Sequence, residues 1–176
     1  MISNNLKTIF KRMMTDRNNS IAELSQQRPV MLVFLRHFGC TFCREALAEL
    51  SQKRHAIEKM GSYLVFVHMS DNKTANRYFN RYNLDGVEHV SDPDCEYYAS
   101  FGLVKGNFRK LFGLSTWIKG FQKGIIEGQG LGQRMGDDFQ MPGVFIVQDG
   151  RIQEHYIHKL ASDRPNYEKL AECCVL

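Results

Sequence analysis

The chain has 176 residues, of which 43% are hydrophobic and 24% charged, and its formal net charge is +4. These values are ordinary for one globular domain, and they exclude collagen-like, strongly disordered and disulfide-scaffold classes. The basic residues are scattered, which argues against a nucleic-acid partner. No apolar stretch approaches the roughly 18 residues of a membrane span. The N-terminus lacks the apolar core of a secretory signal, so we expect a cytoplasmic protein.

The first 28 residues are expected to form a helical extension ahead of a domain that covers residues 29–176. A second short helix is predicted from Ser20, as its N-cap, to Gln27, with Pro29 just beyond its end. The first helix of this extension is predicted from apolar residues at helical spacing, which are Leu6, Ile9, Phe10, Met13 and Met14.

Buried strands and helices alternate after this extension. Residues 30–36 form a continuous apolar run, typical of a strand that is buried on both faces. A long helical pattern covers residues 41–60, a second buried strand covers residues 63–69, and a helical stretch covers residues 74–82. This alternation predicts a parallel βαβ unit.

The middle of the chain is expected to begin with a helix that Asp92 caps, with Pro93 in its first turn and Gly102 at its end. Beyond it, residues 108–123 favour a helix, and the glycine-rich residues 124–136 favour a loop.

Residues 143–147 and 151–158 predict a β-hairpin around Gln148-Asp149-Gly150. Asp163 and Pro165 are then expected to open a C-terminal helix. The elements together predict an α/β fold with a central mixed sheet flanked by helices.

The strongest chemical signal is the motif Cys40-Thr41-Phe42-Cys43, which follows a buried strand and opens a helix. A CxxC motif in this context is typical of a thioredoxin-like redox site. The helix N-terminus favours a thiolate over a thiol, and the i, i+3 spacing puts both sulfurs on one helix face. Arg36, His37 and Arg44 are candidates to stabilise the thiolate with positive charge.

Two other interpretations of the motif remain open. Cys40 and Cys43 could form half of a zinc site, for which His55, Cys95 and His158 are candidate further ligands. They could also be an inert pair of buried thiols in a binding protein without turnover. Cys173 and Cys174 are poor zinc ligands because they are adjacent, and we expect them to have no role.

Four segments resemble the peroxiredoxin-like branch of the AhpC/TSA superfamily, which includes selenoprotein-L-like redoxins and prostamide/prostaglandin F synthases. They are RHFGCTFCREALAEL (36–50), SDPDCEYYASFGL (91–103), DDFQMPGVFIVQDGRIQEHYIH (137–158) and ASDRPNYEKL (161–170). The resemblance implies a thioredoxin-like fold in which Cys40 and Cys43 are catalytic. It also implies a peroxide or disulfide substrate and no bound cofactor or metal. The expected electron donor is thioredoxin, glutathione or a similar dithiol.

The resemblance further implies a substrate groove formed by Thr41, Phe42, Met141 and Pro142. In thioredoxin-like folds a cis-proline loop at the place of Met141-Pro142 faces the CxxC motif and holds the substrate backbone. A proline is also simply tolerated at the start of a strand, so the sequence leaves this point open.

The chain departs from the peroxiredoxin pattern Pro-x-x-x-Thr-x-x-Cys, because Cys40 stands where the threonine would be. Met141 or Pro142 takes the place of the usual arginine, for which Arg36, Arg44 or Arg134 could substitute. If the motif works as in thioredoxin, Cys40 attacks first and Cys43 resolves the mixed disulfide. If it is aligned with the peroxiredoxin pattern, Cys43 attacks and Cys40 resolves. We favour Cys40 as the attacking thiol and a dithiol oxidoreductase as the function, with peroxidase activity also possible.

Two further features belong to the sequence prediction. Cys95 is a possible additional redox thiol, because it falls in the first turn of its expected helix. Trp117 and Phe121 are expected to lie in the core or to cover the site. The sequence leaves the oligomeric state open between a monomer and a homodimer.

Overall fold

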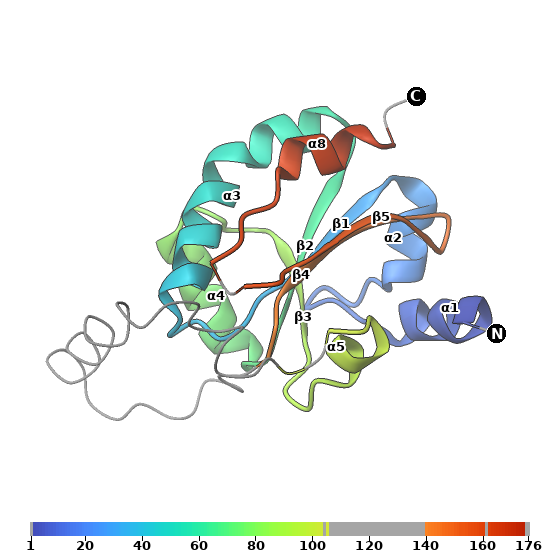
Figure 1. The fold of residues 1–176 in the computed structure, drawn as a ribbon, viewed down its shortest axis with the longest axis horizontal. Coiled ribbons are helices and arrows are strands. Elements are labelled where there is room, and N and C mark those ends of the chain that lie inside the picture. Colours follow the sequence, from blue (N-terminus) through green and yellow to red (C-terminus); the bar gives the residue numbers. More distant parts are fainter. Residues whose placement is uncertain (1, 104, 106–139, 161, 175–176) are drawn as a thin grey trace, which may run out of the picture.

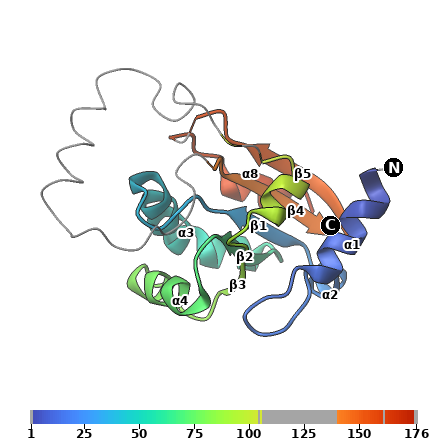
Figure 2. The same ribbon diagram turned by 90° about the horizontal axis from the view of Figure 1, so that it is seen from below.

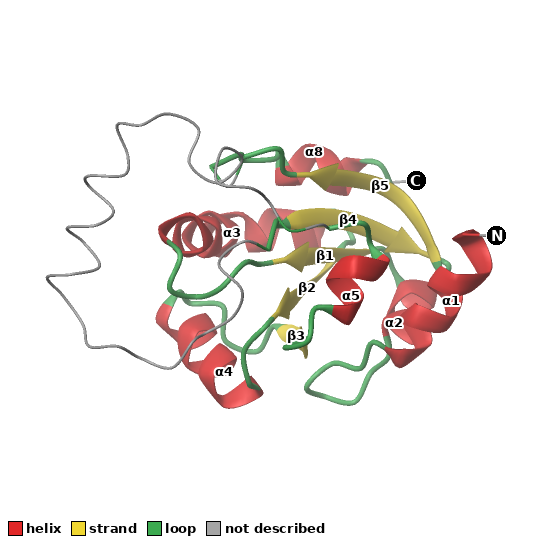
Figure 3. Ribbon diagram, turned by 60° about the horizontal axis from the view of Figure 1, so that its bottom comes forward, coloured by secondary structure: helices red, strands yellow, loops and turns green. Residues whose placement is uncertain are grey.

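The computed structural model describes residues 2–103, 105, 140–160 and 162–174. They form one five-stranded mixed sheet with helices on both faces, which confirms the predicted fold class (Figures 1 and 3). The strand order is β3-β2-β1-β4-β5. The strands are β1 (Val30–Phe34), β2 (Tyr63–His68), β3 (Glu88–Ser91), β4 (Gly143–Gln148) and β5 (Arg151–Ile157). The helices are α1 (Ile2–Arg12), α2 (Ile21–Gln27), α3 (Thr41–Lys59), α4 (Asn72–Arg81), α5 (Glu96–Ser100) and α8 (Tyr167–Glu172).

The predicted helix at 108–123 and the predicted glycine-rich loop at 124–136 lie outside the described residues, as do Trp117, Phe121 and Arg134. Among the helices of the described ranges, none combines the length and the hydrophobicity of a membrane span.

Strand β1 lies at the centre of the sheet, as its continuous apolar sequence predicts. All five of its residues are buried. It pairs in parallel with β2, and its other edge pairs antiparallel with β4, where Phe34 faces Gly143. The end of β1 and the start of β4 therefore lie side by side, and the residues next to both ends are close to the CxxC motif.

The two faces of the sheet hold separate hydrophobic clusters. One cluster joins α3, α4 and α8 to the sheet, and it contains both Cys40 and Cys43. The other joins α1, α2 and α5 to the opposite face. Helices α1 and α2 lie together at one end of the sheet in both views (Figures 1 and 2), and apolar residues of both helices are part of the second cluster.

Strand β3 is an element that the sequence analysis missed. Its sequence, EHVS, is short and polar, yet Glu88 is buried. The Glu88 carboxylate accepts hydrogen bonds from Thr15 (2.5 Å), Asn19 (3.1 Å) and Tyr63 (2.9 Å), which compensate the cost of burying it. These partners come from distant parts of the sequence, so local patterning could not reveal the strand.

The predicted start of α5 is wrong by several residues. The helix begins at Glu96, and Cys95 is the N-cap residue, in a left-handed conformation with φ 58°. Asp92 still caps the helix from a distance, because its carboxylate accepts the backbone N–H groups of Glu96 (3.0 Å) and Tyr97 (2.8 Å). The sequence signal for a cap was thus correct, but an intervening turn places the cap three residues ahead of the N-cap position.

The predicted start of α8 is also wrong. Asn166 caps this helix by accepting the Lys169 N–H at 3.0 Å. Asp163 instead accepts the backbone N–H groups of Lys159 and Leu160, so its carboxylate stabilises the turn before the helix. Elsewhere the cap prediction holds, because Ser20 and Glu23 form the capping box of α2.

The predicted hairpin is confirmed. Strands β4 and β5 pair antiparallel across a two-residue turn, in which Asp149 has φ 52° and Gly150 has φ 66°. Positive φ at both central residues is the geometry that an Asp-Gly pair favours in tight hairpins.

Candidate redox site at the start of α3

The CxxC motif lies where β1 gives way to α3. Cys40 is the N-cap residue of α3, and Cys43 lies in its first turn. Both thiols are buried, with exposed fractions of 2% and 4%. Tyr98 holds the segment between β1 and α3 in place, because its hydroxyl donates to the carbonyl oxygens of Leu35 and Val67.

Arg36 is the residue that contacts both cysteines. Its Nη1 lies 3.0 Å from Cys40 Sγ, and its backbone N–H donates to Cys43 Sγ at 3.2 Å. Its Nε donates to the Gln140 carbonyl at 3.1 Å, which anchors the guanidinium to the segment before β4. Arg36 is only 5% exposed. A positive charge buried this deeply favours a negative partner, and a Cys40 thiolate supplies one.

The pKa values of the two thiols are shifted in opposite directions. A hydrogen bond from the Cys43 thiol, with the charges of Arg36 and His37, lowers the pKa of Cys40 to about 5. The same hydrogen bond, together with burial, raises the pKa of Cys43 well above its usual value. The pair therefore holds one proton near neutral pH, and that proton is on Cys43.

The other predicted neighbours of the motif differ in their placement. His37 is half-buried and contributes to the lowered pKa of Cys40. Arg44 is exposed, and its Nη2 lies 3.5 Å from the hydroxyl of Thr41. Phe42 is half-buried and lines a cavity beside Cys43.

The segment before β4 reaches the site, as expected, but it does not carry a cis peptide bond. The peptide bond between Met141 and Pro142 is trans, and none of the described residues has a cis bond. The cis-proline interpretation is therefore wrong for this chain. Pro142 nevertheless lines the same cavity as Cys43, because β4 begins beside the end of β1.

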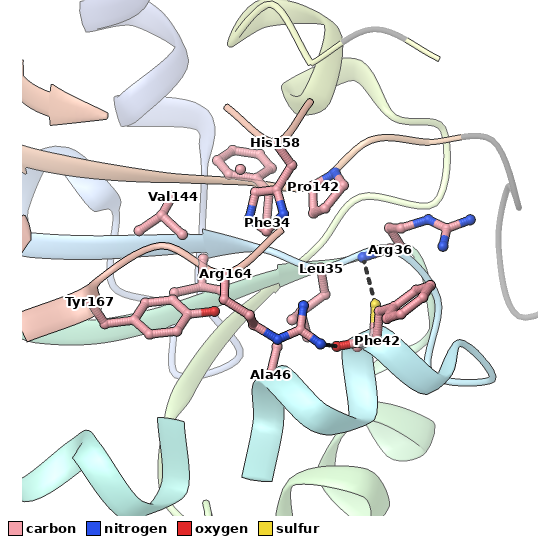
Figure 4. A pocket seen from close by; sticks show the side chains of 13 residues that line it. Phe34, Leu35, Arg36, Phe42, Ala46, Pro142, Val144, His158, Arg164 and Tyr167 are labelled. Carbon is pink, nitrogen blue, oxygen red and sulfur yellow. Dashed lines mark hydrogen bonds between the residues drawn. The ribbon is translucent and has the colours of Figure 1, made fainter. Parts of the chain in front are cut away.

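A cavity of about 20 Å³ adjoins Cys43 (Figure 4). A single water needs about 10–15 Å³ on this measure, so the space suits one small group. Its walls are mostly apolar, and three polar side chains from the C-terminal part of the chain reach it: His158, Arg164 and Tyr167. His158 is buried, its Nδ1 has no hydrogen-bond partner, and burial lowers the pKa of its ring to about 4. This histidine is therefore neutral at physiological pH.

Arg164 connects the C-terminal segment to the first turn of α3. Its Nη2 donates to the Phe42 carbonyl at 3.1 Å (Figure 4). The same atom donates to Glu45 Oε2 at 2.6 Å. The sequence analysis missed Arg164 and Tyr167 as site residues. Both fall within the segment ASDRPNYEKL that carries part of the family resemblance, but no spacing rule links this segment to the cysteines.

The remaining thiols lie away from the CxxC motif. Cys95 packs with the cluster on the opposite face of the sheet. Cys173 and Cys174 are at the end of α8, and all five cysteines are free. Within the described ranges, no three His, Cys, Asp or Glu side chains gather closely enough to hold a metal ion. The zinc interpretation thus finds no further ligands there for Cys40 and Cys43.

The chain is similar to known proteins in sequence and in fold. It is 25% identical over 170 residues to the thioredoxin-like protein AAED1, chloroplastic, of Arabidopsis thaliana, a match that covers 88% of this chain and 65% of that protein. It is 26% identical over 168 residues to prostamide/prostaglandin F synthase of Danio rerio, covering 93% of this chain and 82% of that protein. The crystal structure of peroxidoxin BcpB from Mycobacterium tuberculosis superimposes with a TM-score of 0.62 at 11% identity, covering 93% and 89% of the two chains.

The chain spans less than two thirds of the length of the Arabidopsis protein. The likeness to the solved peroxidoxin shows a shared fold. A sequence model of the AhpC/TSA family matches residues 9–155, which is most of the chain. Family and fold together support a redox function, and the chain belongs to the AhpC/TSA family.

Proposed function

We propose that the protein is a thiol–disulfide oxidoreductase in which Cys40 attacks a peroxide or a disulfide and Cys43 resolves the product. The observation that carries this proposal is the contact of the Arg36 guanidinium with Cys40, which agrees with a lowered pKa of Cys40 and a raised pKa of Cys43. The thiolate is the nucleophilic form of cysteine, and a lowered pKa makes it available at neutral pH.

With a peroxide, the steps balance as follows. The Cys40 thiolate attacks one oxygen of ROOH, the O–O bond breaks, and Cys40 becomes a sulfenic acid while the alkoxide leaves and takes up a proton. The Cys43 thiol then condenses with the sulfenic acid to form the Cys40–Cys43 disulfide and water. A dithiol donor such as thioredoxin, or glutathione, restores the two thiols by exchange.

Burial of the two sulfurs favours a small substrate over a protein disulfide in the reduced protein. With 2% of Cys40 exposed, a peroxide reaches it more readily than a folded protein does. Reduction of the resulting disulfide by a protein donor requires the first turn of α3 to open.

We further propose that the protein works in a reducing compartment such as the cytoplasm.

A second candidate order of attack is favoured by the cavity. The cavity adjoins Cys43, and the backbone N–H of Arg36 donates to its sulfur. A peroxide bound there would be attacked by Cys43, and Cys40 would resolve. The raised pKa of Cys43 opposes this order.

The test is to treat reduced wild type, Cys40→Ser and Cys43→Ser with one equivalent of hydrogen peroxide in the presence of a sulfenic-acid trap. Peptide mass spectrometry then locates each modification. We expect a Cys40–Cys43 disulfide in wild type, trapped sulfenic acid on Cys40 in Cys43→Ser, and slow reaction in Cys40→Ser. Trapped sulfenic acid on Cys43 in Cys40→Ser would instead establish the reversed order.

A parallel assay follows reduction of a small disulfide, such as oxidised glutathione. Wild type that reacts with neither oxidant faster than a free thiol at the same pH would overturn the proposal. That outcome would favour a redoxin-like binding protein without turnover.

A further inference from the structure

A second pair of thiols lies at the end of α8. Cys173 and Cys174 are adjacent in sequence, and their sulfur atoms are 3.2 Å apart. Cys173 is the C-cap residue of α8 and is exposed, whereas Cys174 is half-buried against the cluster beneath α3 and α8. Both sulfurs therefore point to the same place, and at least one of them is open to solvent.

The adjacency of the two residues disfavours a disulfide between them. The Cα atoms of consecutive residues are about 3.8 Å apart across a trans peptide. Cysteines in disulfides usually have their Cα atoms about 4.4–6.8 Å apart. A bond between Cys173 and Cys174 would thus be strained and easily reduced. Cys173 and Cys174 are therefore expected to remain two free thiols under conditions in which an unstrained pair would form a disulfide.

The electrostatic environment of Cys173 is opposite to that of Cys40 in the CxxC motif. Partial desolvation of the sulfur, followed by the hydrogen bond and charge of Cys174 and the charge of Glu154, raises the pKa of Cys173 to about 12. Arg36 contacts Cys40 in the CxxC motif and lowers the pKa of that thiol. The Cys173 thiol therefore stays protonated at neutral pH and is a weak nucleophile toward oxidants.

We propose that Cys173 and Cys174 form a bidentate dithiol site for thiophilic centres, of which trivalent organoarsenicals are the type. Two thiols in contact can bind one such centre, and the second bond forms intramolecularly at high effective concentration. Soft ligands of this kind select soft centres over Mg²⁺ or Ca²⁺. An arsenoxide R–As=O condenses with two thiols to form two As–S bonds and one water. No electrons are transferred, so the step needs no oxidant or reductant.

The test uses phenylarsine oxide on the Cys40→Ser/Cys43→Ser variant, which removes the competing CxxC dithiol. Intact mass spectrometry follows the adduct, and peptide mapping locates it. Samples are then challenged with excess 2-mercaptoethanol and, separately, with 2,3-dimercaptopropanol. Cys173→Ser and Cys174→Ser, each in the same background, are the matched controls, and circular dichroism verifies that every variant is folded.

We expect one phenylarsenic group per chain, mapped to Cys173 and Cys174, which resists the monothiol and is removed by the dithiol. Each single-serine control should retain the group about 100-fold less well, because a chelate becomes a single bond. Because both thiol protons leave in the water that is formed, binding should change little with pH while the thiols are protonated. The proposal is overturned if the monothiol strips the parent variant as readily as the controls, or if the group maps to Cys95. Neither outcome bears on the redox chemistry of Cys40 and Cys43.

Discussion

The guanidinium of Arg36 lies 3.0 Å from the sulfur of Cys40, and both groups are buried. Arg36 stands at the end of β1, and its Nε is held by the Gln140 carbonyl across the sheet. The position of the arginine is thereby fixed by its own backbone after β1 and by the backbone of the segment before β4. Met141 and Pro142 stand directly before β4, and the cation that contacts Cys40 comes from the segment that follows β1.

Replacing this guanidinium should raise the pKa of Cys40. In Arg36→Met we expect a rise of about 1–3 pH units, the usual effect of an opposite charge at this distance. The measurement is the rate of alkylation of Cys40 by iodoacetamide as a function of pH, with the labelled peptide quantified. Arg36→Lys keeps the charge but not the fork of donors, and it should fall between wild type and Arg36→Met.

Arg44→Met is the control for this prediction. Arg44 is exposed and lies beside Thr41, so its loss should leave the alkylation profile of Cys40 unchanged. An equal rise of the pKa in Arg36→Met and Arg44→Met would show that general positive potential, and not the buried contact, stabilises the thiolate.

The thiolate should make the stability of the reduced protein depend on pH. The pKa of Cys40 falls from an ordinary value of 9.0 to about 5 on folding, so ionised Cys40 stabilises the folded state. This contribution is fully present above pH 9 and is lost as pH falls toward 5. Each pH unit between the two pKa values corresponds to about 1.4 kcal/mol, and sharing of the proton with Cys43 reduces the total.

The measurement is urea unfolding of wild type and Cys40→Ser under reducing conditions from pH 5 to pH 9. We expect the stability of wild type relative to the variant to increase with pH across this range. Buried histidines such as His158 titrate in both proteins, so the comparison removes their contribution. A constant difference between the two proteins would contradict an ionised Cys40.

Arg164 should stabilise the start of α3 mainly through the backbone. Arg164→Ala removes the hydrogen bond to the Phe42 carbonyl, and we expect a loss of about 1–2 kcal/mol in the free energy of unfolding. Glu45→Ala removes only a partner that is 56% exposed, and its effect should be below about 1 kcal/mol. Urea denaturation of both variants and of the double variant separates the two contacts. Equal losses in both single variants would assign the stabilisation to the ion pair instead.

Gly143 should not tolerate a side chain. A Cβ atom at this position would lie 2.7 Å from Leu103 Cδ2, and Leu103 is buried. Gly143→Ala is therefore expected to destabilise the protein by about 1–3 kcal/mol through overpacking. Leu103→Ala leaves a cavity, and its loss should combine with Gly143→Ala to less than the sum of the two. Thermal or urea unfolding of the four proteins checks this cycle, and simple additivity would contradict the steric explanation.

Much of the fold could be predicted because its signals are local. The apolar run at β1, the serine cap of α2 and the Asp-Gly turn between β4 and β5 each act over a few residues. The strand β3 was missed because its buried Glu88 is compensated by side chains that lie far away in sequence. The start of α5 was misplaced because a carboxylate can cap a helix from beyond an intervening turn.

Local sequence patterns are enough to place two thiols at a strand-to-helix junction, since strand burial, helix initiation and the CxxC spacing are all local. They named Arg36, His37 and Arg44 as equal candidates to stabilise a thiolate. The packing of distant segments was needed to show that Arg36 contacts Cys40, and that the pKa of Cys40 is lowered while that of Cys43 is raised. It also brought His158 and Arg164 to the cavity beside Cys43 from more than 110 residues away. Hydrogen bonds act over a few ångströms and depend on direction, and charge interactions weaken with distance, so both are set by how distant segments pack.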